Sequence, residues 1–384
     1  MSSNIKKDKF LIVTTVPGSL HFFKGQVGVL KSKFDISVVS SPLSGLKQFS
    51  ELEKVKAHEI NMSREISAFK DFKSLLKFIK LFIKIKPKIV HGNTPKGALL
   101  SMIAGWLTRV PCRIYCVHGL RYQGSTGLKR RLLIGMEYIA CSLATNVYSV
   151  SFGVKKALVE DGICNKKINV IWNGSANGID ISRFSLETVD DTGLRMKYNL
   201  KPDDFVFGFV GRIVKDKGIN ELIEAFVKVN KKYKHAKLLL IGKYEDLDPI
   251  KEETNIAIKT NKNIIYAGFQ KEIKPFLKMM NVFVFPTYRE GLATSLLEAS
   301  AMSKAIISTD ATGCYEVIKD GYNGRVIPVK SKTKLRDAMI ELIENPLLVQ
   351  KFSAESRKSI IERYEQEEFW KKALESYTKI IENV

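Results

Sequence analysis

Cysteine is scarce in this chain of 384 residues, and its five copies are scattered. Their number is odd, and the closest pair, Cys112 and Cys116, has no histidine or second cysteine pair nearby to complete a zinc site. This spacing argues against both a disulfide framework and a zinc site. We expect reduced, mostly buried thiols, as in a cytosolic protein.

Long hydrophobic runs are also absent. No uninterrupted apolar stretch is long enough to span a bilayer, and the run that follows the polar residues 1–10 comprises only Leu11, Ile12 and Val13. Because that run is too short for a signal peptide, we expect the chain to stay in the cytosol. The composition, 45% hydrophobic and 27% charged, is globular, and the length suggests two domains.

Acidic residues are few in the first half of the chain. Residues 1–185 contain 29 Lys and Arg against 11 Asp and Glu, a net charge of +18, whereas the rest contains 33 against 29, or +4. Generic solubility does not predict this asymmetry. The first half should attract lipid headgroups, lipid-linked phosphates or nucleic acid.

Two basic segments contribute to this charge. Residues 69–86 predict an amphipathic helix, whose apolar residues we expect to cover a sheet while its lysines face water; the alternative is a helix that lies on an anionic membrane. The second segment contains Lys129, Arg130 and Arg131 and fits docking on a membrane or an acceptor better. Neither segment interleaves aromatic residues with arginine, so we expect no nucleic-acid partner.

Short apolar runs alternate with amphipathic segments in both halves, which is typical of βαβ units and parallel sheets. Residues 173–180 are rich in turn formers and predict the linker or its entry, and residues 366–382 predict a terminal helix. The expected strands cover residues 10–15, 36–40, 88–91, 113–117 and 146–150, and then residues 205–210, 237–241, 264–267, 282–285 and 305–308.

Ligands of open α/β sheets bind at the carboxyl ends of the strands. In the first half, Gly18, His91 and His118 fall at such ends. His21 lies just inside the first expected helix, within reach of the same edge.

Two carboxylates occur in residues 286–302. Glu290 follows the strand at 282–285, and Glu298 lies in the helix that we expect at 292–302. The start of that helix offers unpaired N–H groups to an anion, which suits a diphosphate. Eight residues of helix rise about 12 Å, so one carboxylate should lie at the mouth of a crevice and the other deeper. Two solvated glutamates are the alternative.

Arg212 and Lys217 lie in the loop at residues 211–218, after another strand. Arginine offers a fork for paired oxygens, lysine offers a point charge, and glycines at both ends of the loop permit close approach of the backbone. The loop is not a P-loop, and no Gly-x-Gly-x-x-Gly follows the first strand, which disfavours a dinucleotide site. Surface cations near Asp216 are the alternative reading.

Together these motifs resemble the retaining glycosyltransferases of family 4, of the bacterial surface-polysaccharide type, which have the GT-B fold. The resemblance rests on the loop at 211–218 followed by Glu290 and Glu298, on residues 177–184, which are similar to the family's interdomain segment, and on residues 309–324. It covers nearly the whole chain.

The resemblance implies roles in donor binding. Glu298 would hold the ribose of a nucleotide. Arg212 and Lys217 would hold the diphosphate and stabilise it as a leaving group, assisted by backbone N–H groups of Gly18 and of the helix start around Thr294.

It also implies the catalytic and acceptor sides. Glu290 would hold hydroxyls of the donor sugar beside the reacting carbon, and His118 would approach the far side of that sugar. The residues expected on the acceptor or membrane side are His21, Lys129, Arg130 and Arg131.

The implied fold has two Rossmann-like domains that face a cleft: an acceptor-binding domain at residues 1–183 and a nucleotide-sugar-binding domain at 184–365, with residues 366–384 as a helix that packs back on the first. Such enzymes transfer with retention and need no metal, so the resemblance implies no cofactor and no metal. The expected partners are a donor, here a UDP-sugar carrying a hexose with or without an N-acetyl group, a polyprenyl-diphosphate-linked glycan acceptor, and an anionic membrane at the inner face of the plasma membrane.

Two alternatives remain. A nucleotide-sugar 2-epimerase has the same fold, although it would not need the two glutamates together with Arg212 and Lys217. The second alternative is a non-catalytic protein that binds anionic surfaces, and only the net charge supports it.

Overall fold

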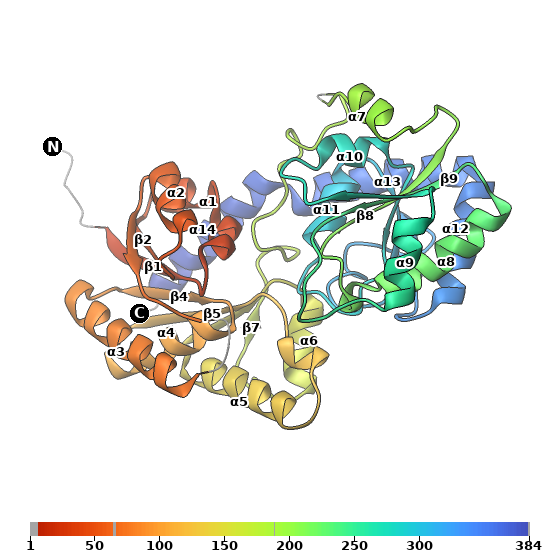
Figure 1. Ribbon diagram of the computed structural model, residues 1–384. Coiled ribbons are helices and arrows are strands. Elements are labelled where there is room, and N and C mark those ends of the chain that lie inside the picture. The colour runs from red at the N-terminus through yellow and green to blue at the C-terminus, as the bar shows by residue number, and fades with distance from the viewer. Residues whose placement is uncertain (1–6, 64–66, 188, 383–384) are drawn as a thin grey trace. The chain divides into compact units, whose positions relative to one another are not determined.

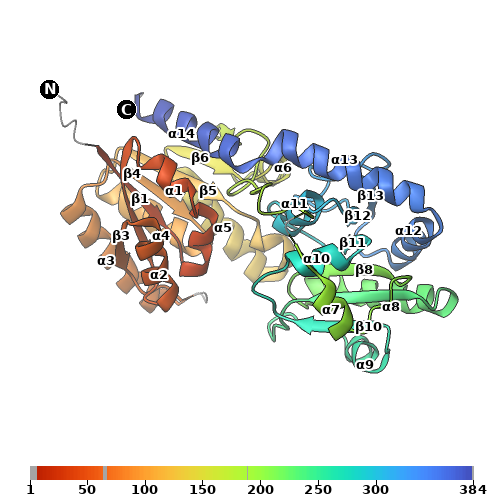
Figure 2. The same ribbon diagram turned by 90° about the horizontal axis from the view of Figure 1, so that it is seen from above.

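The computed structural model describes residues 7–63, 67–187 and 189–382 (Figures 1 and 2). The chain divides into two compact units, Met1–Gly178 with Glu367–Val384, and Ile179–Gln366. The domain boundaries predicted from the sequence were 183/184 and 365/366. The absence of a signal peptide was predicted partly from the polar residues 1–10. Residues 1–6 of that segment lie outside the described residues. No helix in the described part of the chain is both long and apolar enough to cross a membrane.

The first unit is built on a seven-stranded parallel sheet in the order β3-β2-β1-β4-β5-β6-β7. The order reverses between β1 and β4, where Ile12 lies opposite both Val38 and His91. Ligand sites of such sheets form at that switch point. The five predicted strands are confirmed, and two short edge strands, β3 and β7, were missed. The strands are β1 Asp8–Val13, β2 Phe34–Ser40, β3 Lys56–Glu59, β4 Ile89–Asn93, β5 Cys112–Val117, β6 Asn146–Ser149 and β7 Ile168–Asn169.

Helices cover both faces of this sheet (Figure 2). One core contains side chains of α3, α4 and α5, and the core on the opposite face contains side chains of α1, α2 and α14. The single helix expected after β1 is instead two short helices, η1 and α1. The helical segments are η1 Pro17–Phe23, α1 Gln26–Leu30, α2 Ser44–Glu53, α3 Ala68–Ile85, α4 Pro95–Leu107, η2 Arg121–Gly124, α5 Gly127–Leu143, α6 Phe152–Glu160 and α14 Gln366–Glu382.

The second unit has a six-stranded parallel sheet in the order β10-β9-β8-β11-β12-β13. Its order reverses between β8 and β11, which pair with each other. All five predicted strands are present, and β13 was missed. The strands are β8 Phe205–Val210, β9 Ala236–Ile241, β10 Ile264–Gly268, β11 Val282–Phe285, β12 Ala305–Thr309 and β13 Gly324–Ile327. The helical segments are α7 Thr192–Lys197, η3 Lys215–Lys217, α8 Ile219–Lys232, α9 Glu252–Thr260, α10 Lys274–Met279, α11 Thr294–Ala301, α12 Lys332–Glu344 and α13 Pro346–Tyr364.

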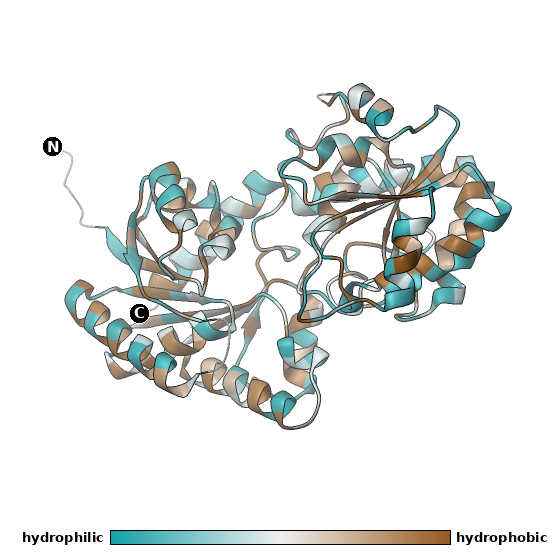
Figure 3. Cartoon of the chain, in the orientation of Figure 1, coloured by the Kyte–Doolittle hydropathy of each residue, from teal (hydrophilic) through white to brown (hydrophobic). Residues whose placement is uncertain are grey.

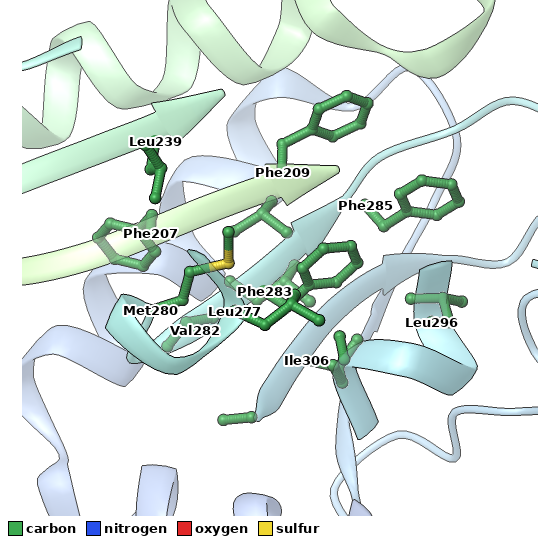
Figure 4. Close-up of a cluster of buried hydrophobic side chains, with 14 of the residues drawn as sticks. Phe207, Phe209, Leu239, Leu277, Met280, Val282, Phe283, Phe285, Leu296 and Ile306 are labelled. Atoms are coloured by element: carbon green, nitrogen blue, oxygen red, sulfur yellow. The ribbon is translucent and has the colours of Figure 1, made fainter. Parts of the chain in front are cut away.

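The core of the second unit fixes the elements that carry the candidate site (Figure 4). All four residues of β11, Val-Phe-Val-Phe, are buried, as expected for a strand of a sheet that is covered on both faces. Leu296 of α11 is fully buried in the same core. Burial of one leucine side chain contributes about 1.5–3 kcal/mol, which holds the start of α11 against the sheet.

The apolar residues of α3 do not all face the core. Phe78 and Phe82 are buried, but four others are exposed. Hydrophobic and hydrophilic residues alternate along the ribbon of α3 (Figure 3). The four exposed residues form a stripe, because their spacing of three, four and seven residues keeps them on one side of the helix. The prediction that the apolar residues of this helix cover the sheet is therefore wrong for this stripe. Its members and their exposed fractions are Phe69 70%, Phe72 57%, Leu76 50% and Ile83 60%.

Candidate functional site

Two loops leave neighbouring strands of the second unit at their carboxyl ends. One follows β8 at residues 211–218, and the other follows β11 at residues 286–293. Gly218 has φ +71°, and a Cβ atom there would lie 2.0 Å from the carbonyl oxygen of Pro286. Only glycine permits this approach, so the two loops are in direct contact.

Lys217 and Glu290 meet at this contact. Lys217 Nζ donates to Glu290 Oε1, and the two side chains are only 13% and 16% exposed. Thr287 Oγ1 lies 3.1 Å from the same carboxylate oxygen. Because each buried charge compensates the other, removal of either partner leaves an unpaired charge in a poorly hydrated place.

The loop after β12 supports Glu290 from the other side. The Glu290 N–H donates to the carbonyl of Thr312 at 3.0 Å, and the Ala293 N–H donates to that of Gly313 at 3.2 Å. Gly313 has φ +75°, and a Cβ atom there would lie 2.4 Å from the Gly291 oxygen. Three loops thus hold one carboxylate.

α11 begins at Thr294, four residues after Glu290. Ala293 is its N-cap and offers no side-chain acceptor to the first turn. Within the described residues, the N–H groups of Thr294 and Ser295 have no acceptor. Unpaired N–H groups and the positive end of the helix dipole can bind an anion.

Glu298 lies one turn further along α11 and is partly exposed. Burial raises the pKa of this carboxyl to about 7; nearby Glu272 raises it further, and Arg183 opposes the shift. The predicted helical rise between Glu290 and Glu298 is wrong, because α11 begins only at Thr294.

Arg212 is not at the Lys217–Glu290 contact. Its Nη1 lies 2.7 Å from Glu245 Oε2, and both side chains are well exposed. The alternative that Arg212 and Lys217 are both surface cations near Asp216 does not hold either: Asp216 pairs with Arg289 at 2.7 Å, and Lys217 is mostly buried.

His118 lies just after β5 in the first unit. Its ring stacks on Phe22 at 4.6 Å with an interplanar angle of 10°, and its Nε2 is 2.8 Å from Asn93 Oδ1. Burial lowers the pKa of His118 to about 4. His91, which was expected at the ligand-facing edge, is instead fully buried within β4.

The other residues predicted in the first unit lie on its surface. Gly18 and His21 are exposed on η1. In the first turn of α5, Lys129, Arg130 and Arg131 are exposed. The Arg130 guanidinium also lies over the Tyr122 ring, 5.6 Å from its centroid.

Sequence reasoning missed Thr287, Arg289 and Asn93. Thr287 is fully buried, and its hydroxyl donates to Glu290. Thr287 could have been found from its position in the sequence, because it lies between the end of a strand and a candidate catalytic glutamate. Asn93 could have been found from its spacing, since it lies two residues after His91 and therefore on the same face of the strand.

Two parallel α/β units, with charged loops at the carboxyl ends of β8 and β11, agree with the expected GT-B fold. Residues 190–363 match the glycosyl transferases group 1 family, and residues 11–151 match the glycosyl transferase 4-like family. The chain belongs to these glycosyltransferases, so the predicted family and enzyme class are confirmed.

Three known proteins illustrate what this chain is similar to. The capsular polysaccharide biosynthesis glycosyltransferase CapM of Staphylococcus aureus is 36% identical over 380 residues, which cover 98% of each chain. The UDP-Gal:alpha-D-GlcNAc-diphosphoundecaprenol alpha-1,3-galactosyltransferase of Escherichia coli is 26% identical over 82% of each chain. The structure of Anabaena HepE in complex with UDP-glucose superposes with a TM-score of 0.81 at 17% identity, covering 97% of this chain and 99% of that one. The last likeness confirms the fold.

Proposed function

We propose that this enzyme transfers a hexose, with retention, from a UDP-sugar to a lipid-linked glycan during assembly of a bacterial surface polysaccharide. The buried Lys217–Glu290 pair beside the uncapped start of α11 carries the donor half of the proposal. The names of the Staphylococcus aureus and Escherichia coli relatives support the pathway and the acceptor class. The UDP-glucose bound to HepE supports the donor class.

In the proposed donor complex, the diphosphate lies at the N–H groups of Thr294 and Ser295 and contacts Lys217. Its oxygens compete with Glu290 for the lysine, which leaves the Glu290 carboxylate able to accept hydrogen bonds from the sugar hydroxyls. Fixed cations and N–H dipoles stabilise the charge that develops on the leaving UDP, so we propose no metal and no cofactor. Arg212 leaves Glu245 and binds the same diphosphate.

Glu298 is proposed to bind the ribose. A carboxylate accepts hydrogen bonds from two adjacent hydroxyls, whereas the protonated acid is a poorer acceptor. Its pKa of about 7 therefore makes the donor affinity sensitive to pH near neutrality.

The acceptor side is proposed to include an anionic membrane surface. α5 exposes an apolar stripe at Leu128, Leu132 and Ile139, which are 82%, 51% and 44% exposed. Basic side chains flank this stripe, and α3, which covers the same face of the sheet, carries its own exposed apolar stripe and lysines. Each basic residue near an anionic membrane contributes about 1 kcal/mol. His21 is assigned to the glycan acceptor.

A thermal-shift screen tests the donor assignment, because a ligand that binds the native state raises its melting temperature by mass action. UDP and at least one UDP-sugar should raise the melting temperature more than the corresponding ADP and GDP compounds. The epimerase alternative predicts isomerisation of a UDP-N-acetylhexosamine in the absence of an acceptor, whereas the proposed function predicts none.

A further inference from the structure

Two consecutive ion pairs join the loops that follow β8 and β11. Lys217 pairs with Glu290, and the residue before each of them pairs as well, with Arg289 Nη2 2.7 Å from Asp216 Oδ2. The side chains of Arg289 and Asp216 are 30% and 21% exposed. The proposed donor contacts use the first pair and leave the second without a role.

Asp216 is also held through its main chain. Its N–H donates to Asp248 Oδ2 at 2.8 Å, and the N–H of Lys215 donates to the main-chain oxygen of Asp248 at 3.2 Å. The carbonyl of Asp216 accepts from the N–H of Tyr288 at 2.9 Å. These bonds and the Arg289 pair tie Asp216 both to the segment after β9 and to the loop after β11.

The Lys217 side chain takes no part in these bonds. Adjacent Cα atoms are about 3.8 Å apart, so a fixed Asp216 also restricts the main chain of Lys217. The lysine ammonium group lies at the end of a flexible four-carbon stem and can change its partner by rotation of the side chain alone. Asp216 is therefore an anchor that does not depend on which anion Lys217 contacts.

Donor binding requires such a change of partner. In the proposed complex, the diphosphate competes with Glu290 for Lys217, so the ion pair between these two residues opens. The pair of Asp216 and Arg289 contains no group that the donor displaces, and it still joins the two loops at that moment. Position matters here, because a displacement of about 1 Å at a catalytic group can cost about 100-fold in rate.

We propose that Asp216 and Arg289 are positioning residues that hold the main chain of Lys217 in place while its ammonium group passes from Glu290 to the donor diphosphate. This inference rests on the proposed function, which assigns Lys217 to that diphosphate. Neither Asp216 nor Arg289 contacts the donor.

Asp216→Ala tests this role, because two explanations predict opposite results. Coulomb attraction alone predicts tighter binding of UDP, since the variant loses a negative charge beside a site for an anion. The positioning role predicts weaker binding. Calorimetric titrations should show that the variant loses most of the wild-type preference for UDP over UMP, which is at least about tenfold, with the affinity for UMP unchanged. The kcat with a UDP-sugar should fall by up to about 100-fold. Equal or tighter binding of UDP overturns the proposal.

Variants of Arg289 distinguish positioning from direct contact with the donor. Arg289→Ala should match Asp216→Ala, and the double variant should be no worse than either single one, because the two residues act as one pair. Arg289→Lys keeps a cation for Asp216 and should restore most of the preference for UDP. Loss of this preference in Arg289→Ala but not in Asp216→Ala would mean that Arg289 binds the diphosphate itself, which overturns the proposal.

Arg325→Ala is the matched control. Arg325 of β13 pairs with Glu341 of α12, with Nε 2.7 Å from Oε2, and the two side chains are 27% and 34% exposed. The control should lower the melting temperature about as much as Asp216→Ala does and keep the preference for UDP. The same loss of preference in the control would show general destabilisation and overturn the positioning role. A wild type without any preference for UDP contradicts the proposed function as well, whereas a preference that survives in Asp216→Ala contradicts the positioning role alone.

Discussion

Lys217 and Glu290 lie 73 positions apart in the chain and form a mostly buried ion pair between the loops that follow β8 and β11. The pair brings the residue expected on the diphosphate into contact with the residue expected on the sugar. In a donor, the β-phosphate is bonded directly to the sugar's reacting carbon. Contact between these two side chains therefore suits a ligand in which phosphate and sugar are adjacent.

Lys217→Ala should lower turnover by about 10²–10³-fold, because removal of one preorganised charge at a developing leaving group costs about that much. Steady-state UDP release with a UDP-sugar donor and a polyprenyl-diphosphate-linked glycan acceptor measures this. The control is Lys215→Ala, an exposed lysine in the same loop. Wild-type turnover in Lys217→Ala would contradict the assignment of Lys217 to the donor site.

Arg212→Ala should separate activity from stability. The Arg212–Glu245 pair is exposed, and such pairs contribute about 0–1 kcal/mol, so the melting temperature should hardly change. Turnover should fall strongly, since the proposed function moves this guanidinium onto the diphosphate. Glu245→Gln breaks the same pair and should leave turnover near the wild-type level. Equal losses in both variants would mean that the pair itself, and not phosphate binding, matters.

Glu298 should make both stability and donor binding depend on pH. Its folded-state pKa of about 7 lies above the ordinary value of 4.5, so the folded state holds a proton that the unfolded state has released between these two values. Stability should consequently fall as pH rises from 4.5 to 7 and then level off. UDP affinity should rise through pH 7, as the carboxylate forms.

The Glu298→Gln variant separates this effect from titration of the ligand. UDP titrates its own phosphate in the same range, but that contribution is common to both proteins. Calorimetric titrations at pH 6 and pH 8 should show a smaller change of affinity in the variant. The same change in both proteins would exclude Glu298 as the source.

Gly218→Ala should disrupt the contact between the two loops. The new Cβ atom would meet the Pro286 oxygen at 2.0 Å in a left-handed backbone conformation, so one loop must move. A lower melting temperature and weaker UDP binding are expected. Gly193→Ala is the control in the same unit, because nothing lies within 4 Å of its Cβ position. Unchanged UDP affinity in Gly218→Ala would show that the loop contact does not shape the site.

Membrane binding can be tested by flotation with anionic and neutral liposomes. The protein should float with the anionic ones, and a Leu128→Ser/Leu132→Ser variant should float less, since it removes apolar area from the exposed stripe of α5. Ile256→Ser is the control, because this residue is 50% exposed on α9 in the second unit. Equal binding to both liposomes would contradict an electrostatic surface.

The strands and the two charged loops could be predicted because buried parallel strands are continuous apolar runs. β8 and β11 have the predicted bounds, whereas β13 contains Arg325 within four residues and gave no such run. The partner of a flexible side chain could not be predicted: the motif gives no hint that Arg212 pairs with Glu245. The periodicity also predicted that α3 has an apolar side. It did not show how few of the residues on that side are buried in the core.

The most direct test compares the affinities of UDP and UMP for the wild-type enzyme and for Lys217→Ala, since the two nucleotides differ only in the β-phosphate. A hydrogen bond to a charged group contributes about 1.5–3 kcal/mol, so the wild type should bind UDP at least about tenfold more tightly than UMP. Lys217→Ala should lose most of that preference while its affinity for UMP stays the same. An undiminished preference for UDP in the variant would contradict a diphosphate site at Lys217.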